Sequence, residues 1–508
     1  MDFSALIRKV KVIALACSLL SAVLLGLASC SNVFDLENHA SVEIKKETPP
    51  VEEPSDKTEP GKDTGAEEDE KEPELSAINP PSPLSLTERH WTILLYMSAD
   101  NDLEAAAMED LCEMEFSSLN TDQVTVLALV DRSPAYDTSC DNWYGSRLYK
   151  IQTGREADCR TLISTELECR DLGLSLGKET ELDMSSSYVL SSALTYVRKR
   201  YPANHYGLVI WGHGTGWRSG SENAGAAGNA VSRVAAPVKG FSFDSTSGTY
   251  MTLCQIGEGI RAGLNGVKLD FLGFDTCYGG EIEVLYELKD YAKYFAGSAG
   301  LIDASGWNYE GLFSEFQNCR EKTAEDLCGC VISQFKNQYA YKSKAGIFCA
   351  DMGKFSEYFD TCEAMWENAA SKIVNADRRD SLMKALYSGS NCKVKRYSYG
   401  GSGSDIYLDI ASMMEAIFGL YNCKALYEKY LAAESALFFE SWASDSDQAG
   451  AGVYFSTLND SNNLCFRHPL AYIKGETSQQ ILFVRDSQGY VPTQSGGKSL
   501  LDKLFYFN

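Results

Sequence analysis

The sequence predicts an α/β fold with a mainly parallel sheet flanked by helices on both faces and additional helix-rich structure toward the C-terminus. Two observations lead to this fold class. Short apolar runs alternate with amphipathic stretches from residue 91 onward, and the stretch after the first run opens with Ser, Asp and Asn, which cap helices. Strands that alternate with helices in this way are typical of parallel sheets whose two faces are both covered.

The expected elements follow one another along the chain. Helices are expected at 98–118, 185–202 and 250–264, and an antiparallel strand or hairpin arm at 143–152, where polar and apolar residues alternate. The buried strands of the sheet are expected at 91–97, 124–131, 206–211, 267–275 and 291–300. After residue 310 the chain is helix-rich, with further apolar strand candidates at 345–351, 405–411, 451–457 and 480–484.

The N-terminal residues do not look like part of this fold. Basic residues precede an apolar run at 12–29, as in a secretory signal, and the run ends in LASC, which resembles the box in which a bacterial lipoprotein is lipidated on its cysteine, here Cys30. A transmembrane anchor is the alternative, because the run borders on the length of a bilayer span. Residues 31–88 hold eight of the thirteen prolines among dense Asp and Glu, which indicates a disordered acidic tether.

These features predict four regions: a lipoprotein signal (1–30), the tether (31–88), a folded core (89–310) and a helix-rich region that completes the core or packs on it (311–508). They place the protein outside the cytoplasm, anchored by lipid in a bacterial cell envelope, at the outer membrane or cell surface. The formal net charge of −24 argues against nucleic acid as a partner, because phosphate binding needs clustered Lys and Arg. We expect a monomer.

Sixteen cysteines are spread over the 508 residues and do not form a compact disulfide framework. Several lie in apolar or helical contexts, where we expect small hydrophobic side chains: Cys112, Cys254, Cys349 and Cys423. The pair Cys328 and Cys330 has no second pair at zinc-ligand spacing, so no metal site is predicted there. The sequence leaves any disulfide pairing open.

His213 is one of only five histidines, and it follows the apolar run at 206–211 between Gly212 and Gly214. A histidine near a strand end is most often structural. Flanking glycines, however, let the backbone approach a ligand closely and leave the imidazole exposed. In an open parallel sheet, reactive groups collect where strands end at their carboxyl side.

Cys277 stands at a similar place, after the apolar run at 267–275 and before Gly279 and Gly280 at the expected start of a helix. Free amide groups at a helix N-terminus favour a thiolate. A buried structural cysteine is the alternative. Because Cys277 and His213 each follow a predicted parallel strand, with one crossover between them, they form a plausible nucleophile–base pair.

Four segments give these residues a context: WTILLYMSADNDLE, YGLVIWGHGTGW, DSTSGTYMT and LGFDTCYGG, in this order. They resemble the clostripain family of cysteine peptidases, which is related to caspases, gingipains and legumain. The resemblance covers about residues 90–310 and is weak beyond. It implies a caspase-like sheet, Cys277 as nucleophile, His213 as its partner and protonator of the leaving amine, and an oxyanion hole made by the N–H groups of Gly214 and Cys277.

The resemblance implies cleavage after Arg or Lys in protein or peptide substrates, with Asp275 as the acidic residue of the pocket that binds this side chain. The segment 297–307 departs from the family pattern, with Ala299 to Ile302 in the places where the family has glutamates and a Pro-Gly; either Asp303 substitutes as the carboxylate or the pocket has lost its strong basic preference. No third catalytic residue is identifiable. Asp100 and Asp102 follow the first strand, where helix capping is the expected role.

Family members often mature by self-cleavage between the His and Cys segments. Here the Gly- and Ala-rich stretch 218–240 looks like an exposed loop, and Arg233 and Lys239 are the candidate sites; an ordinary surface loop is the alternative. Some members need calcium, but no EF-hand-like spacing occurs here, so we expect no obligatory cofactor.

Two other functions remain open at this level. One is a non-catalytic envelope lipoprotein that binds peptide or glycan on the same fold. The other is a hydrolase or transferase that uses the same pair of residues on a non-peptide acyl group.

Overall fold

The computed structural model describes most of the chain after the predicted tether. The described residues are 90–156, 158–217, 240–342, 345–387, 394–398, 405–444, 450–456, 482–491 and 498–505. Within these ranges no helix is long and apolar enough to cross a membrane. The predicted signal, Cys30 and the tether lie outside the described residues.

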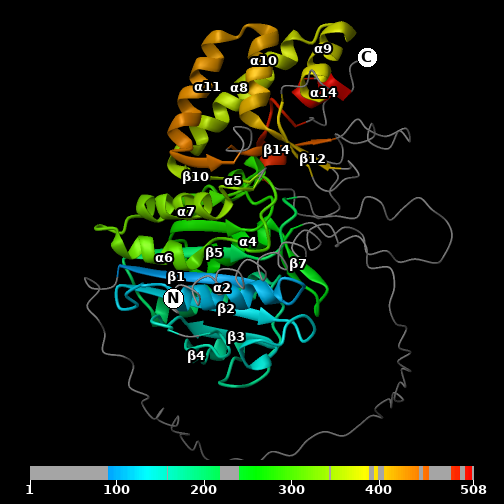
Figure 1. Cartoon of the computed structure of the whole chain (residues 1–508). Helices are drawn as coiled ribbons and strands as arrows, with labels where there is room; N and C mark the ends of the chain where they lie inside the picture. The colour runs from blue at the N-terminus through cyan, green and yellow to red at the C-terminus, as the bar shows by residue number, and fades with distance from the viewer. Residues whose placement is uncertain are drawn as a thin grey trace, which may run out of the picture. The chain divides into compact units, whose positions relative to one another are not determined.

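A nine-stranded sheet forms the centre of the fold, in the order β13-β10-β9-β8-β5-β1-β2-β3-β4 (Figure 1). The five inner strands run parallel: β1 (Trp91–Ala99), β2 (Val124–Arg132), β5 (His205–Trp211), β8 (Leu269–Asp275) and β9 (Ala292–Gly297). Both edges are antiparallel: β3 (Gly145–Lys150) and β4 (Thr165–Leu167) at one, β10 (Gly346–Asp351) and β13 (Glu440–Ala443) at the other. Two strands from the region after residue 310 thus extend this sheet.

Helices cover the two faces of the sheet and enclose two hydrophobic clusters. Alternate residues of β1 show why both faces must be covered: Leu95 and Met97 belong to one cluster, and Leu94 and Tyr96 to the other. The first cluster includes residues of α2 (Glu104–Phe116), α6 (Tyr309–Asn318) and α7 (Ala324–Tyr339). The second includes residues of α3 (Ser187–Arg200), α4 (Leu253–Gly263) and α5 (Ile282–Leu288). The predicted parallel α/β fold is confirmed.

The C-terminal region adds a group of helices beyond β10, at one end of the sheet (Figure 1). They are α8 (Phe355–Lys372), α9 (Ala376–Tyr387), α10 (Ile410–Tyr421), α11 (Lys424–Leu437), α13 (Leu482–Asp486) and α14 (Leu500–Phe505). Short 3-10 turns occur at η2 (Cys140–Asn142), η3 (Arg170–Leu172) and η4 (Met352–Lys354).

Strands at 405–411 and 451–457 form, but in a separate sheet that joins β11 (Arg396–Ser398), β12 (Asp405–Asp409) and β14 (Gly452–Ser456). The strand predicted at 480–484 is wrong, because its described part lies in α13. There the Leu482 N–H donates to Glu287, and Phe483 packs against Tyr286 and Phe359. A short apolar run does not distinguish a strand from a buried helix, and here tertiary packing decides.

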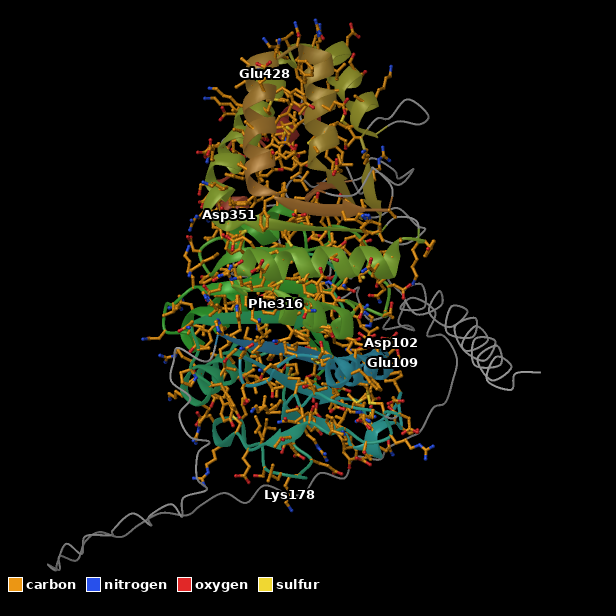
Figure 2. All side chains as sticks on the ribbon, turned by 60° about the vertical axis from the view of Figure 1, so that its left-hand side comes forward. Asp102, Glu109, Lys178, Phe316, Asp351 and Glu428 are labelled. Carbon is orange, nitrogen blue, oxygen red and sulfur yellow. A yellow bond between two sulfur atoms is a disulfide. The ribbon has the colours of Figure 1, made fainter. Side chains whose placement is uncertain are left out.

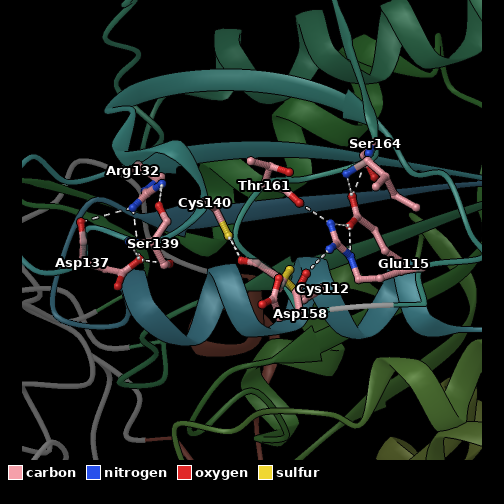
Figure 3. The surroundings of a disulfide bond; sticks show 12 residues. Cys112, Glu115, Arg132, Asp137, Ser139, Cys140, Asp158, Thr161 and Ser164 are labelled. Atoms are coloured by element: carbon pink, nitrogen blue, oxygen red, sulfur yellow. Dashed lines mark hydrogen bonds and ion pairs between the residues drawn. A yellow bond between two sulfur atoms is a disulfide. The ribbon is translucent and has the colours of Figure 1, made fainter.

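Cys112 is not the isolated hydrophobic residue that we expected, because it forms a disulfide with Cys159 (Figure 3). A loop folds back over α2 and brings Cys159 there. Glu115 of the same helix holds this loop through an ion pair with Arg155 and hydrogen bonds from the backbone of Ile163 and Ser164. The pairing spans 47 residues and depends on this long-range contact, so no local sequence signal predicts it.

Candidate active site

The His and Cys segments lie side by side because β5 and β8 are neighbouring parallel strands. Trp211 pairs with Asp275 at the carboxyl ends of these strands, and the N–H of Gly212 donates to the Asp275 carbonyl over 3.3 Å. His213 and Cys277 each lie two residues beyond this pair. The structure therefore brings together the two segments that carry the residues singled out by the sequence.

The two segments approach each other so closely that Gly214 has no space for a side chain. A Cβ atom built there would lie 2.2 Å from the carbonyl oxygen of Cys277 and 2.9 Å from the side chain of Thr276. Gly212 is restricted in another way, since its φ of +132° is one that residues with side chains rarely adopt. The glycines around His213 are thus required by backbone contact and conformation.

His213 contacts an acidic residue that follows β1. Its Nε2 lies 2.6 Å from Oδ1 of Asp102, and the side chains are 18% and 38% exposed. Figure 2 shows Asp102 near α2 at the side of the molecule. The ring of Phe243 stands edge-on to the imidazole with 6.0 Å between centroids. The histidine is therefore held from two sides, by a carboxylate and by an aromatic ring.

The helix-capping role expected for Asp100 and Asp102 is wrong. The N-cap residue of α2 is Leu103 and not either aspartate, and the Leu103 side chain makes no capping hydrogen bond. Asp100 instead accepts a hydrogen bond from the backbone N–H of Thr246. Acidic residues after a strand are typical of caps, but here contacts with segments more than a hundred residues away determine their roles.

The thiol of Cys277 lies against the backbone of the loop that follows β9. The N–H of Ile302 donates to Sγ over 3.3 Å, and the Ile302 carbonyl oxygen lies 3.4 Å from Sγ. The Ile302 N–H can donate to the sulfur, and the Ile302 carbonyl oxygen can accept from the neutral thiol, so this backbone positions the sulfur in either form. The sequence singled out this loop for its unusual residues at 299–302, but it gave no sign that the loop backbone reaches the nucleophile.

Asp275 is buried beneath the site, where its Oδ2 accepts hydrogen bonds from the Trp307 N–H at 3.0 Å and from the Tyr309 hydroxyl at 2.9 Å. Its Oδ1 has no hydrogen-bond partner among the described residues. Burial raises the pKa of Asp275 to about 7, although both hydrogen bonds work to lower it. A carboxylate with one free oxygen can still bind a cationic group that reaches it.

Asp303, the other pocket candidate, already has a cationic partner. It forms an ion pair with Lys342 and accepts hydrogen bonds from the N–H and hydroxyl of Ser305. Burial works to raise the pKa of Asp303, but Lys342 and Ser305 hold it below its usual value. The self-cleavage candidates Arg233 and Lys239 lie outside the described residues.

Asp102 and Phe243 are neighbours of His213 that were not predicted from the sequence. For Asp102 a signal existed, because it follows a parallel strand at the sheet edge where His213 and Cys277 also lie. Phe243 lies in a hairpin of β6 (Phe241–Asp244) and β7 (Thr249–Met251) that the hydrophobic pattern does not reveal.

Several known proteins are similar to this chain in sequence or in structure. Clostripain from Hathewaya histolytica is 24% identical over 235 residues, which are 44% of this chain and 42% of that protein, so the chain spans less than half of that relative's length. Among solved structures, an inactive zymogen protease from Parabacteroides distasonis shares 18% identity at a TM-score of 0.48, covering 73% of this chain and 90% of the other. A secreted cysteine protease from Bacteroides thetaiotaomicron, in complex with an irreversible peptide inhibitor, shares 17% identity at a TM-score of 0.49, covering 74% and 95%.

The Clostripain family model matches residues 95–482, which is well over half of the chain. The chain therefore belongs to the clostripain family of cysteine peptidases.

Proposed function

We propose that this protein is a cysteine endopeptidase in which Cys277 is the nucleophile and His213 the general acid–base. The observation that carries the proposal is the meeting of the two segments at the ends of β5 and β8, with Gly214 packed on the Cys277 carbonyl. The Cys277 thiolate attacks the peptide carbonyl carbon and forms a tetrahedral oxyanion. The N–H groups of Gly214 and Cys277 stabilise this oxyanion.

His213 transfers a proton in both steps of the reaction, the formation of the thioester and its hydrolysis. Its imidazolium gives a proton to the leaving amine as the C–N bond breaks, which leaves a thioester on Cys277. Water then attacks the thioester and gives up a proton to the imidazole, and the carboxylic acid product is released with the thiolate restored. Because Nε2 faces Asp102, Nδ1 is the ring nitrogen left for the substrate. This chemistry needs no metal or other cofactor.

The proposed substrates are proteins or peptides with Arg or Lys before the scissile bond. Asp275 supports this preference, since it is buried near the nucleophile and keeps one oxygen without a hydrogen bond among the described residues. A guanidinium or ammonium group would supply the missing partner. Asp303 is the weaker candidate because Lys342 already neutralises it.

The proposal also includes how the enzyme is activated and where it is located. Self-cleavage after Arg233 or Lys239 would activate the enzyme, and a lipid on Cys30 would tether it to the bacterial envelope. Both rest on the sequence patterns described above.

Labelling and library cleavage test the proposal together. A peptide acyloxymethyl ketone with Arg before the warhead should alkylate the parent chain and leave Cys277→Ala unlabelled, and a peptide library should be cut after Arg or Lys. If neither basic nor neutral probes label the protein, the non-catalytic binding protein on the same fold is the better account. Cleavage of acyl substrates without any peptide cleavage would favour the alternative hydrolase.

A further inference from the structure

Gly216 follows His213 by three residues and has no space for a side chain. Its φ of +82° is one that residues with a side chain rarely adopt. A Cβ atom built there would overlap the hydroxyl oxygen of Tyr407 and lie 2.9 Å from Oε1 of Glu281. Tyr407 belongs to β12 in the C-terminal region, so a residue from far along the chain reaches the His segment. The third glycine of GHGTGW thus makes room for this tyrosine.

The Tyr407 hydroxyl holds the backbone that follows Gly214. It donates a hydrogen bond to the Thr215 carbonyl oxygen over 3.2 Å, although 192 residues separate the two in the chain. In addition, the N–H of Thr215 donates to the Gly240 carbonyl oxygen over 3.0 Å. Because Thr215 is joined directly to Gly214, these two hydrogen bonds restrain the N–H group that Gly214 contributes to the proposed oxyanion hole.

The Tyr407 ring packs on the residue that follows the nucleophile. Its centroid lies 5.4 Å from that of the Tyr278 ring, with 34° between the ring planes, and both tyrosines are buried. Tyr278 has a φ of +53°, a conformation that a bulky residue keeps only where its surroundings impose it. The N–H of Tyr278 also donates to the Gly300 carbonyl oxygen over 2.9 Å. Tyr407 therefore contacts both catalytic segments, the His segment through its hydroxyl and the Cys segment through its ring.

The strand beside β12 contacts the Cys segment as well. In β14, the N–H of Gly452 donates to the Gly280 carbonyl oxygen over 3.2 Å, and the N–H of Tyr454 donates to Oε1 of Glu283 over 2.9 Å. Tyr454 pairs with Tyr407 across the two antiparallel strands. The strand that carries Tyr407 is thus attached through its neighbour to the backbone around the nucleophile.

We propose that Tyr407 is a positioning residue of the active site, which fixes the two N–H groups of the oxyanion hole relative to each other. The proposal rests on the peptidase function proposed above, because the hole belongs to that reaction. Donors stabilise an oxyanion only when they are held in place before it forms, so a small displacement of one donor lowers the rate. Tyr407 acts through Thr215 and Tyr278 and not on the reacting atoms. On this account, the C-terminal region completes the active site.

Tyr407→Phe tests the proposal, because it removes only the hydroxyl group. On the peptide that the parent cleaves best, kcat should fall by roughly tenfold with little change in KM, since the oxyanion hole acts on the transition state and not on the bound substrate. A tyrosine that only fills the core would lower the Tm and leave kcat unchanged.

Tyr397→Phe is the matched control. Tyr397 stands directly opposite Tyr407 in the same sheet and is also buried. Its hydroxyl donates to the Gly450 carbonyl and to the Asp409 carboxylate, which lie outside both catalytic segments. Each variant loses a buried hydrogen bond, so both should lower the Tm by a similar few degrees. Only Tyr407→Phe should lower kcat.

Hydrogen exchange supplies a readout that does not depend on activity, with full-length Cys277→Ala as the background so that self-cleavage does not interfere. Adding Tyr407→Phe should speed the exchange of backbone amides in 214–217 by at least about tenfold. Adding Tyr407→Ala, which also removes the ring, should speed exchange in 278–280 as well. Adding Tyr397→Phe should leave both stretches at the rate of the background.

An unchanged kcat in Tyr407→Phe, or an equal loss of kcat in Tyr397→Phe, would overturn the proposal and leave Tyr407 as a core residue. A raised KM with an unchanged kcat would also overturn it, because Tyr407 would then serve substrate binding. If the parent neither cleaves peptides nor reacts with the acyloxymethyl ketone probes, the proposed function fails. Unchanged exchange in the Tyr407 variants of an active enzyme would overturn the positioning role alone.

Discussion

Nε2 of His213 lies 2.6 Å from Oδ1 of Asp102, although 111 residues separate them in the chain. The contact orients the imidazole and, in the mechanism proposed above, offers a carboxylate to the imidazolium that would donate to the leaving amine. Neither residue is deeply buried, so the charge pair is partly screened by water. Its main expected effect is therefore orientation, with electrostatic stabilisation second.

We predict that Asp102→Asn lowers kcat by roughly tenfold to a hundredfold with little change in KM, because acid–base catalysis depends on a correctly oriented imidazole. Steady-state kinetics on an Arg peptide measures both constants. Thermal unfolding should show an unchanged Tm, since the pair is solvent-accessible. A raised KM with an unchanged kcat would instead place Asp102 in substrate binding.

Gly214→Ala should reduce kcat/KM by at least about a hundredfold, because the added Cβ would meet the Cys277 carbonyl at 2.2 Å and displace the oxyanion hole. The matched control is Gly329→Ala, in α7, where a Cβ meets no atom within 4 Å. That control should keep full activity and gain up to about 1 kcal/mol of stability, because Ala favours a helix over Gly. Full activity in Gly214→Ala would remove this residue from the oxyanion hole.

The raised pKa of Asp275 predicts that the enzyme's preference for Arg peptides depends on pH. Its pKa of about 7 means that the carboxyl is mostly neutral at pH 6 and mostly ionised at pH 8, and only the ionised form attracts a guanidinium. The ratio of kcat/KM for an Arg peptide to that for its neutral citrulline isostere should therefore rise with pH through this range. Taking the ratio cancels the ionisations of Cys277 and His213, which affect both peptides.

The control for this prediction is Asp275→Asn, which should lower the ratio and remove its pH dependence. Asp303→Asn should change it little, because Lys342 already pairs with that carboxylate. If Asp303→Asn strongly lowers this ratio of kcat/KM values and Asp275→Asn does not, then Asp303, and not Asp275, is the carboxylate that binds the Arg side chain.

The Cys112–Cys159 disulfide should contribute roughly 2–4 kcal/mol to stability, as expected for a loop that spans 47 residues. Cys159→Ser should lower the Tm under oxidising conditions and leave it insensitive to reductant, whereas reductant should lower the Tm of the parent. Catalytic constants should change little, since the bridge joins α2 to a loop that lacks the candidate catalytic residues (Figure 3). An unchanged Tm in Cys159→Ser would show that the bridge does not form in solution.

Local patterns were sufficient to predict the parallel strands and the meeting of the Cys277 and His213 segments. Continuous apolar runs force burial on both faces, and glycines after two of the runs marked their reactive ends. Of the two partners of His213, Asp102 was predictable from its place after a parallel strand but carries an ordinary capping signal as well, whereas Phe243 lies on a hairpin that tertiary contacts position and that no local pattern reveals. The disulfide and α13 were missed for the same reason, since each depends on packing between segments far apart in the chain.

Self-cleavage in the stretch 218–240 should be visible on a denaturing gel. If the stretch 218–240 is cut after Arg233 or Lys239, the purified parent should run as two fragments on a denaturing gel, while Cys277→Ala should run as one. Mixing active parent with Cys277→Ala distinguishes cleavage within one molecule from cleavage between molecules, because only the second converts the variant. Arg233→Ala combined with Lys239→Ala should keep the chain intact, and its activity shows whether the cut is required. An intact parent that still cleaves peptides would contradict the activation step and leave the peptidase assignment in place.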